Sequence, residues 1–308
     1  MLDVNRHPAH PPASALGGKM VRRGRVLAGC AAFSLMGGQA PATPPGDPIR
    51  AAEPSGATIV VTGSRNELFE AYIDALTKTR GNQQIARWNG HICPRALGLD
   101  AAHNGYLAAR VVEIAKANGV LVERGACVPN ILIVVTDEAD RFVDLLLERH
   151  PLLFGNDGVP PTPVKQALRA PKPVRWINAS AWGNADGRPL DGKNNFVYSA
   201  SRLQESTRRN AFVSVVVVDA KKIEHITWRA LSAYLAMVAI ALPPPDLNPP
   251  DGGTILSLFE PNGSPGPADL TRWDRAYLKA LYKSDSAASA GAQRQAILRA
   301  ATREKLGE

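Results

Sequence analysis

The sequence predicts an α/β domain in which helices flank a mixed β-sheet, with an α+β arrangement as the alternative. Two apolar runs, 131–135 and 212–218, have the length and continuity of strands that are buried on both faces. Segments with helical spacing of apolar residues lie between and after these runs. With 45% apolar residues among 308, the chain can build one sizeable core. We therefore expect a single domain over 58–285.

The first half of this domain switches between the two periodicities. Residues 58–62 form a β-branched run typical of an edge strand, and Asn66 can then cap a helix that reaches Thr79. A second helix is expected over 101–118, with Gly119 as its C-terminal stop.

A short strand at 84–88 and a helix at 137–150 complete this half of the domain. The prolines between 160 and 173 then predict a break in regular structure. Further candidate strands, suited to an antiparallel edge or hairpin, contain Trp176, Phe196 and Tyr198.

Helices dominate the C-terminal part. Thr227 can cap a helix that reaches Leu242, where three consecutive prolines end it. An amphipathic helix follows over 269–282. The final segment, 286–308, is expected to be a peripheral helix centred on 290–305.

The N-terminus has the order of a secretory signal. Three arginines within 22–25 precede a small and apolar run, 26–38, and a small-residue site follows, with cleavage expected after Ala40 or Ala42. Residues 1–40 are thus interpreted as a signal with an N-terminal extension. Residues 41–57 are a flexible lead-in rich in Pro, Ala and Gly.

Two alternatives remain open within this segment. Met20 offers a more ordinary signal start than Met1. Residues 27–30, Leu-Ala-Gly-Cys, fit a lipobox, so a peripheral lipid anchor through Cys30 competes with simple cleavage. No later stretch reaches the roughly 18 uncharged apolar residues of a membrane helix. We expect a protein of the periplasm or cell envelope without a transmembrane span.

Export determines how the cysteines are interpreted. With Cys30 in the signal, Cys93 and Cys127 remain as an even pair in a compartment that favours disulfides. The alternative is a reactive thiol at Cys93 beside His91, as in a Cys/His hydrolase. His91 is the one catalytic candidate that the sequence offers.

The charge of the chain gives little support for a nucleic-acid partner. The formal net charge is +8, but residues 1–40 hold five Lys/Arg and one Asp, so the remainder carries +4. The basic residues do not form one stripe. We expect no binding of nucleic acid, and only a weak anion-binding potential at four arginines. These are Arg95, Arg202, Arg208 and Arg209.

The sequence contains no motif that specifies a reaction. It has no phosphate loop ending in Lys-Ser or Lys-Thr, no GxSxG, no CxxC and no HExxH. The histidines outside the signal segment have no pair at helical i, i+4 spacing, so we predict no metal site and no cofactor. These histidines are His91, His103, His150 and His225.

The final third resembles the metzincin-type zinc proteases in layout. An apolar strand, a helix at 231–242, a Pro/Asp/Gly loop, the segment 254–259 and a further helix follow one another. The resemblance implies a zincin-like scaffold without its metal ligands. In place of the histidines and glutamate of that family, the helix carries Ser232, Ala233, Tyr234, Ala236 and Met237.

Most of the chain resembles a group of uncharacterised exported bacterial envelope proteins, which implies export but no activity. The matching segments are 59–65, 93–94, 97–99, 125–130, 199–202, 233–237 and 273–278. Residues 59–65 also resemble the start of the plug of TonB-dependent receptors, and that likeness implies a docking role.

Two functions follow as hypotheses. The first is a non-enzymatic envelope protein that binds a partner or ligand near 88–99 and 202–209. The second is a hydrolase, either a degenerate zincin-like peptidase or an enzyme with a dispersed catalytic site that includes His91.

The signal interpretation predicts the mass of the mature protein. Intact-mass spectrometry after export from a bacterial host should show a chain that starts at Pro41 or Thr43, because cleavage follows Ala40 or Ala42. A chain that begins at a diacylglyceryl-modified Cys30 would contradict simple cleavage and establish the lipid anchor.

Overall fold

The computed structural model describes residues 62–79, 83–154, 162–184, 190, 205–249, 253–260 and 266–306. The chain divides into two units, Met1–Thr58 and Ile59–Glu308, and all of these residues belong to the second. The expected signal, the lead-in and Cys30 lie outside the described residues. Phe196 and Tyr198 lie outside them as well.

The described strands form one mixed sheet in the order β1-β2-β4-β3. Its members are β1 (Pro94–Leu97), β2 (Ile131–Thr136), β3 (Val174–Asn184) and β4 (Thr207–Asp219). β1, β2 and β4 are parallel, whereas β3 pairs antiparallel with β4 at the edge. The predicted α/β class with a mixed sheet is thus confirmed.

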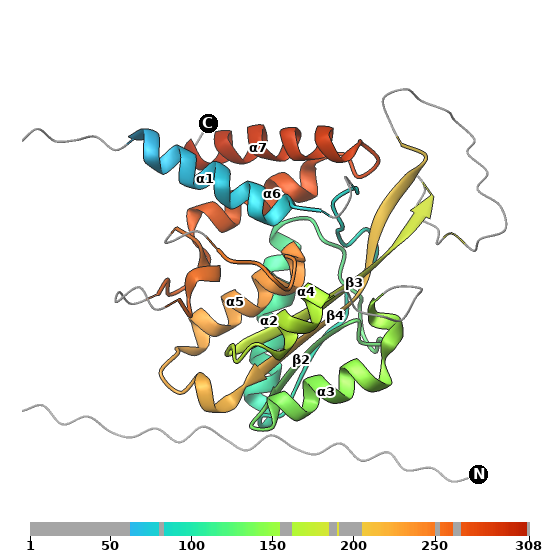
Figure 1. Ribbon diagram of the computed structural model, residues 1–308, viewed down its shortest axis with the longest axis vertical. Helices are drawn as coiled ribbons and strands as arrows, with labels where there is room; N and C mark the ends of the chain where they lie inside the picture. The colour runs from blue at the N-terminus through green and yellow to red at the C-terminus, as the bar shows by residue number, and fades with distance from the viewer. Residues whose placement is uncertain are drawn as a thin grey trace, which may run out of the picture. The chain divides into compact units, whose positions relative to one another are not determined.

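Helices cover both faces of this sheet (Figure 1). In β4, Val216 and Val218 face the main core, whereas Val215 and Val217 face a smaller second core, as the two-residue period of a strand requires. The main core lies against α1 (Thr62–Thr77), α2 (Ala101–Ala117), α5 (Trp228–Ala241), α6 (Arg272–Lys283) and α7 (Ala290–Leu306). The second core lies against α3 (Ala139–Arg149) and α4 (Thr162–Arg169).

Helix α5 is the central helix of the main core. Every residue over 230–241 is buried, so its apolar character on all sides reflects its position. The Thr227 hydroxyl accepts a hydrogen bond from the Ala230 N–H, as the sequence predicted, and the helix ends at Leu242 in a left-handed conformation before the prolines. None of the described helices has both the length and the apolarity that a bilayer crossing needs.

Four segments differ from the sequence prediction. Residues 62–65 begin α1 rather than ending an edge strand, because the apolar face of this helix, including Phe69 and Tyr72, is buried in the main core. The expected strand at 84–88 is reduced to a single bridge between Arg87 and Asn210.

Helix α4 occupies part of the segment where prolines predicted a break. Pro163 stands in its first turn, where a missing N–H breaks no intrahelical hydrogen bond. The last helix, α7, was expected at the periphery. It instead packs against α1 and α6, and its Ile297 and Ala301 side chains are fully buried in the main core.

A buried carboxylate fixes α1 and α6 relative to each other. Asp274 is fully buried, and its two oxygens accept hydrogen bonds from two hydroxyl groups and two backbone N–H groups. The donors are Tyr72 Oη (2.8 Å), Thr254 Oγ1 (2.6 Å), Ile255 N (2.8 Å) and Thr271 N (2.8 Å). Burial and the neighbouring carboxylate raise the pKa of Tyr72 well above its usual value, so this hydroxyl stays a donor.

Removal of this carboxylate should weaken the fold. We expect Asp274→Ala to lower the free energy of unfolding by about 3 kcal/mol, because it leaves several buried donors without an acceptor. Urea denaturation measures the change. The matched control is Glu148→Ala on α3, an exposed acid whose loss should cost less than about 0.5 kcal/mol. Equal effects of the two substitutions would show that the Asp274 network is not a determinant of stability.

Candidate ligand-binding site

A cavity of about 640 Å³ lies along the outer strand β3. It is lined by residues 177–180 of β3, the C-terminal part of α1, the segment 83–86 and the loop 242–248 after α5. Leu153, Phe154, Val164 and Arg209 complete the wall. We call it the β3-edge cavity. Its volume is within the usual range of small-molecule sites.

The β3-edge cavity is bounded by both faces of β3. Ile177 belongs to the second core, and Ala179 lies on the same face because alternate strand residues share a face. Phe154 and Val164 extend this apolar wall. Asn178 and Ser180 line the cavity from the opposite face, so the cavity includes the strand edge between the two faces.

Arg209 contributes a partly buried positive charge to the cavity. From β4, its Nε donates to Ser180 Oγ at 2.9 Å and its Nη1 donates to Gln83 Oε1 at 2.6 Å, both neutral acceptors. The guanidinium carbon also lies 5.3 Å from the centre of the Trp182 ring, a cation–π arrangement. Burial lowers the pKa of Arg209.

No ion pair within the described residues includes Arg209. Two carboxylates line the cavity, and one of these, Asp74, is paired with Arg294. The other, Asp246, is exposed, as is Lys78, so these two opposite charges are well hydrated. Arg209 is therefore the main positive group that faces the interior of the cavity.

The backbone of β3 presents hydrogen-bonding groups to the same cavity. The Asp219 N–H donates to the Pro173 carbonyl at 2.9 Å. The backbone hydrogen-bonding groups of Pro173 and of every second residue after it therefore point toward β4. The residues between them, including Trp176, Asn178 and Ser180, point outward. Within the described residues, nothing forms a hydrogen bond with the outward N–H and C=O groups of these three.

An irregularity in the sheet does not alter this alternation. The register shifts between Ala179 and Ser180, and the extra residue is Phe212 on β4, which has no partner on β3. The carbonyl of Trp182, the next outward residue after Ser180, accepts from the Leu190 N–H at 3.3 Å. The backbone groups of every second residue of β3 thus still point away from β4 beyond the register shift.

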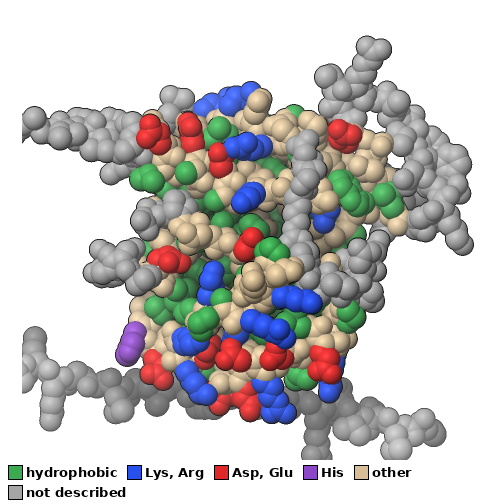
Figure 2. Space-filling model, viewed as in Figure 1, with side chains coloured by type: hydrophobic (Ala, Val, Ile, Leu, Met, Phe, Trp, Pro, Cys, Tyr) green, Lys and Arg blue, Asp and Glu red, His purple; other side chains and the backbone are tan. Residues whose placement is uncertain are grey.

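Only one of the four arginines that the sequence suggested lies at the cavity. Arg209 lines it, whereas Arg208 precedes it on β4 and lies on the opposite face. Arg95 is exposed on β1 at the other edge of the described sheet, and Arg202 lies outside the described residues. Basic and acidic side chains are intermixed on the described part of the face in Figure 2.

The other suggested binding segment, 88–99, does not reach the cavity. Trp88 is buried, and its Nε1 donates to the Ala239 carbonyl at 2.8 Å, so it is a core residue and not part of a surface. The cavity residues that sequence reasoning missed are Gln83, Asn178 and Ser180. They belong to no motif, and only the edge position of β3 brings them together.

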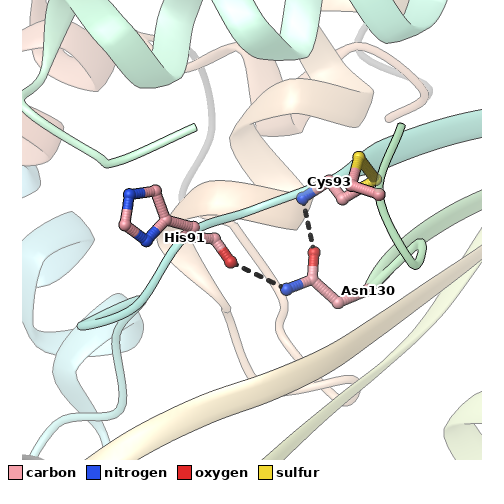
Figure 3. Close-up of a disulfide and its surroundings, with 4 residues drawn as sticks. His91, Cys93 and Asn130 are labelled. Carbon is pink, nitrogen blue, oxygen red and sulfur yellow. Dashed lines mark hydrogen bonds between the residues drawn. A yellow bond between two sulfur atoms is a disulfide. The ribbon is translucent and has the colours of Figure 1, made fainter. Parts of the chain in front are cut away.

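Cys93 and Cys127 form a disulfide, with their Cα atoms 6.2 Å apart (Figure 3). The Asn130 side chain holds the same segment, because its Oδ1 accepts from the Cys93 N–H at 2.7 Å and its Nδ2 donates to the His91 carbonyl at 2.9 Å. A bonded sulfur is not a thiolate nucleophile, so this arrangement leaves no Cys/His pair at His91.

The His91 side chain is exposed beside a second, smaller hollow that Lys116 and Glu123 also line. Its ring forms no hydrogen bond with any described residue. Within the same part of the chain, no three His, Cys, Asp or Glu side chains are grouped so that they could hold a metal ion. The geometry around His91 therefore supplies neither an activated nucleophile nor an oriented base.

Comparison of the chain with protein-family models, curated proteins and solved structures finds no match in any of the three. The metzincin and envelope-protein resemblances therefore stay predictions, and function is argued from the geometry of the site.

The disulfide predicts an absence of free thiols at Cys93 and Cys127 in the exported protein. Titration of the unreduced, unfolded protein should detect neither thiol. The double variant Cys93→Ala/Cys127→Ala should lose about 3 to 4 kcal/mol of stability, the loop-closure estimate for a loop of this length, less any strain. Two reactive thiols in the mature protein would contradict the bridge.

Proposed function

We propose that the chain is an exported, non-enzymatic protein of the bacterial envelope that binds a ligand in the β3-edge cavity. The observation that carries this proposal is Arg209, a partly buried guanidinium that lines a cavity with both apolar and polar walls and whose hydrogen-bond partners among the described residues are neutral. A partly desolvated cation of this kind is well suited to an anionic group of a ligand.

The lining of the cavity supports a ligand with both apolar and anionic parts. Ile85, Phe154 and Leu247 supply apolar surface, which favours burial of a hydrocarbon portion. The side chain of Gln83 adds a polar group that can fix the orientation of the ligand, whereas the Asn178 amide is held by Ser214 and Pro243.

Two features support export. The N-terminal sequence has the order of a secretory signal, and the Cys93–Cys127 bridge suits an oxidising compartment. A lipid anchor at Cys30 would hold the same protein at a membrane surface, so it is part of the proposal as the alternative to a free periplasmic form.

The hydrolase remains the alternative function. It is less favoured because the ring of His91 has no hydrogen-bonded partner among the described residues. Hydrolysis of an ester or peptide substrate that His91→Ala abolishes, with the fold intact, would overturn the binding-protein proposal.

The cavity predicts binding of an amphiphilic anion, for which 8-anilinonaphthalene-1-sulfonate serves as a fluorescent probe. We expect one site per chain and at least tenfold weaker binding to Ala86→Trp, because Ala86 lines the cavity and the indole ring would occupy it. Fluorescence titration measures the affinity, and circular dichroism verifies the fold.

The control is Ala126→Trp, an exposed position beside the disulfide and outside the lining of the cavity, which should bind the probe as the parent does. Equal affinities of the parent and both variants would place the probe elsewhere and contradict the proposed site.

A further inference from the structure

We infer that the ligand of the β3-edge cavity is an extended acidic peptide that adds to the sheet as a strand beside β3. This inference rests on the proposed binding function and names the class of ligand. It follows from three properties of the cavity: a strand edge whose backbone groups have no partner among the described residues, different chemistry on the two faces of that edge, and the charge of Arg209.

The backbone edge supplies a row of donors and acceptors. Asn178 and Ser180 line the cavity and direct their N–H and C=O groups away from β4. Trp176 has the same orientation but is buried and lies outside the cavity lining. Outward residues two apart along a strand form the hydrogen-bonding ladder of a sheet. A small rigid ligand can use one or two of these groups, whereas an extended peptide can pair with the whole row.

The two sides of the cavity match the alternation of a strand. Successive side chains of an added strand point to opposite faces of the sheet. One face offers Phe154, Val164 and Ile177, which favour apolar side chains. The other face offers Gln83 and Arg209, which favour polar or acidic side chains. The geometry therefore selects a peptide that alternates apolar and acidic residues.

Arg209 is oriented to contact the acidic side chains of such a peptide. Its guanidinium lies next to Ser180, an outward residue of the edge, and hydrogen bonds with Ser180 and Gln83 hold it in place. Contact with the Trp182 ring restricts it further. A cation that is already held loses little conformational entropy when a carboxylate binds.

Acetylated and amidated hexapeptides test the inference. The first alternates leucine and glutamate, and the second alternates leucine and glutamine. Isothermal titration calorimetry with the full mature chain should show at least tenfold tighter binding of the glutamate peptide. Arg209→Gln should remove this preference. The matched control Arg208→Gln alters the neighbouring arginine on the opposite face and should preserve the preference.

Backbone methylation tests strand addition without any protein variant. Two isomers of the glutamate peptide carry N-methyl groups on all leucines or on all glutamates, and only one of these sets faces β3 in an added strand. One isomer should lose at least tenfold in affinity, and the other should bind much more tightly than it. Equal affinities of the two isomers would overturn strand addition.

The outcomes also separate this inference from the proposed function. Binding of the naphthalene sulfonate in the cavity, with no binding of the hexapeptide, would overturn the peptide and preserve a cavity for a small anion. Absence of both ligands from the cavity would overturn the inference and the proposed function together. A glutamate preference that Arg209→Gln leaves unchanged would remove Arg209 from its role.

Discussion

The buried carboxylate of Asp274 is the interaction on which the arrangement of the main core depends. It joins Tyr72 of α1 to the start of α6 and to the backbone N–H of Ile255. Its hydrogen bonds come from segments about 200 residues apart in the chain, so they restrain the tertiary structure rather than one helix. Because the end of α1 lines the β3-edge cavity, the same carboxylate also helps to determine the shape of the candidate site.

Sequence patterns predicted the elements that carry a continuous apolar run or a local capping residue. The run 131–135 belongs to β2, an interior strand whose residues Ile131, Ile133 and Val135 are buried in the main core, and Thr227 caps α5 through a local hydrogen bond. The patterns failed where tertiary packing outweighs local preference. Residues 62–65 are helical because the rest of α1 is anchored in the core, and α4 forms although Pro163 lies in its first turn.

The candidate site was less predictable than the fold. Arg209 was identified from the sequence as an arginine that could bind an anion, but nothing in the sequence distinguished it from Arg208, which lies on the opposite face. Which of the two arginines faces the cavity depends on the alternation of side chains along β4, close to the extra residue Phe212. No sequence pattern indicated that the backbone groups of Asn178 and Ser180 would be available for hydrogen bonding. Their availability depends on β3 being the last described strand of the sheet.

A strand edge without a neighbouring strand can pair with the same edge of another copy of its own chain as readily as with a ligand, and this is a common route to aggregation. In β3 the edge is accompanied by the guanidinium of Arg209, which lies against Ser180. Two copies joined antiparallel around Ser180 would bring two partly desolvated positive charges into one groove, where they would repel each other. The residue that attracts an acidic ligand would thereby also disfavour self-association of the chain at concentrations at which an uncharged edge would pair.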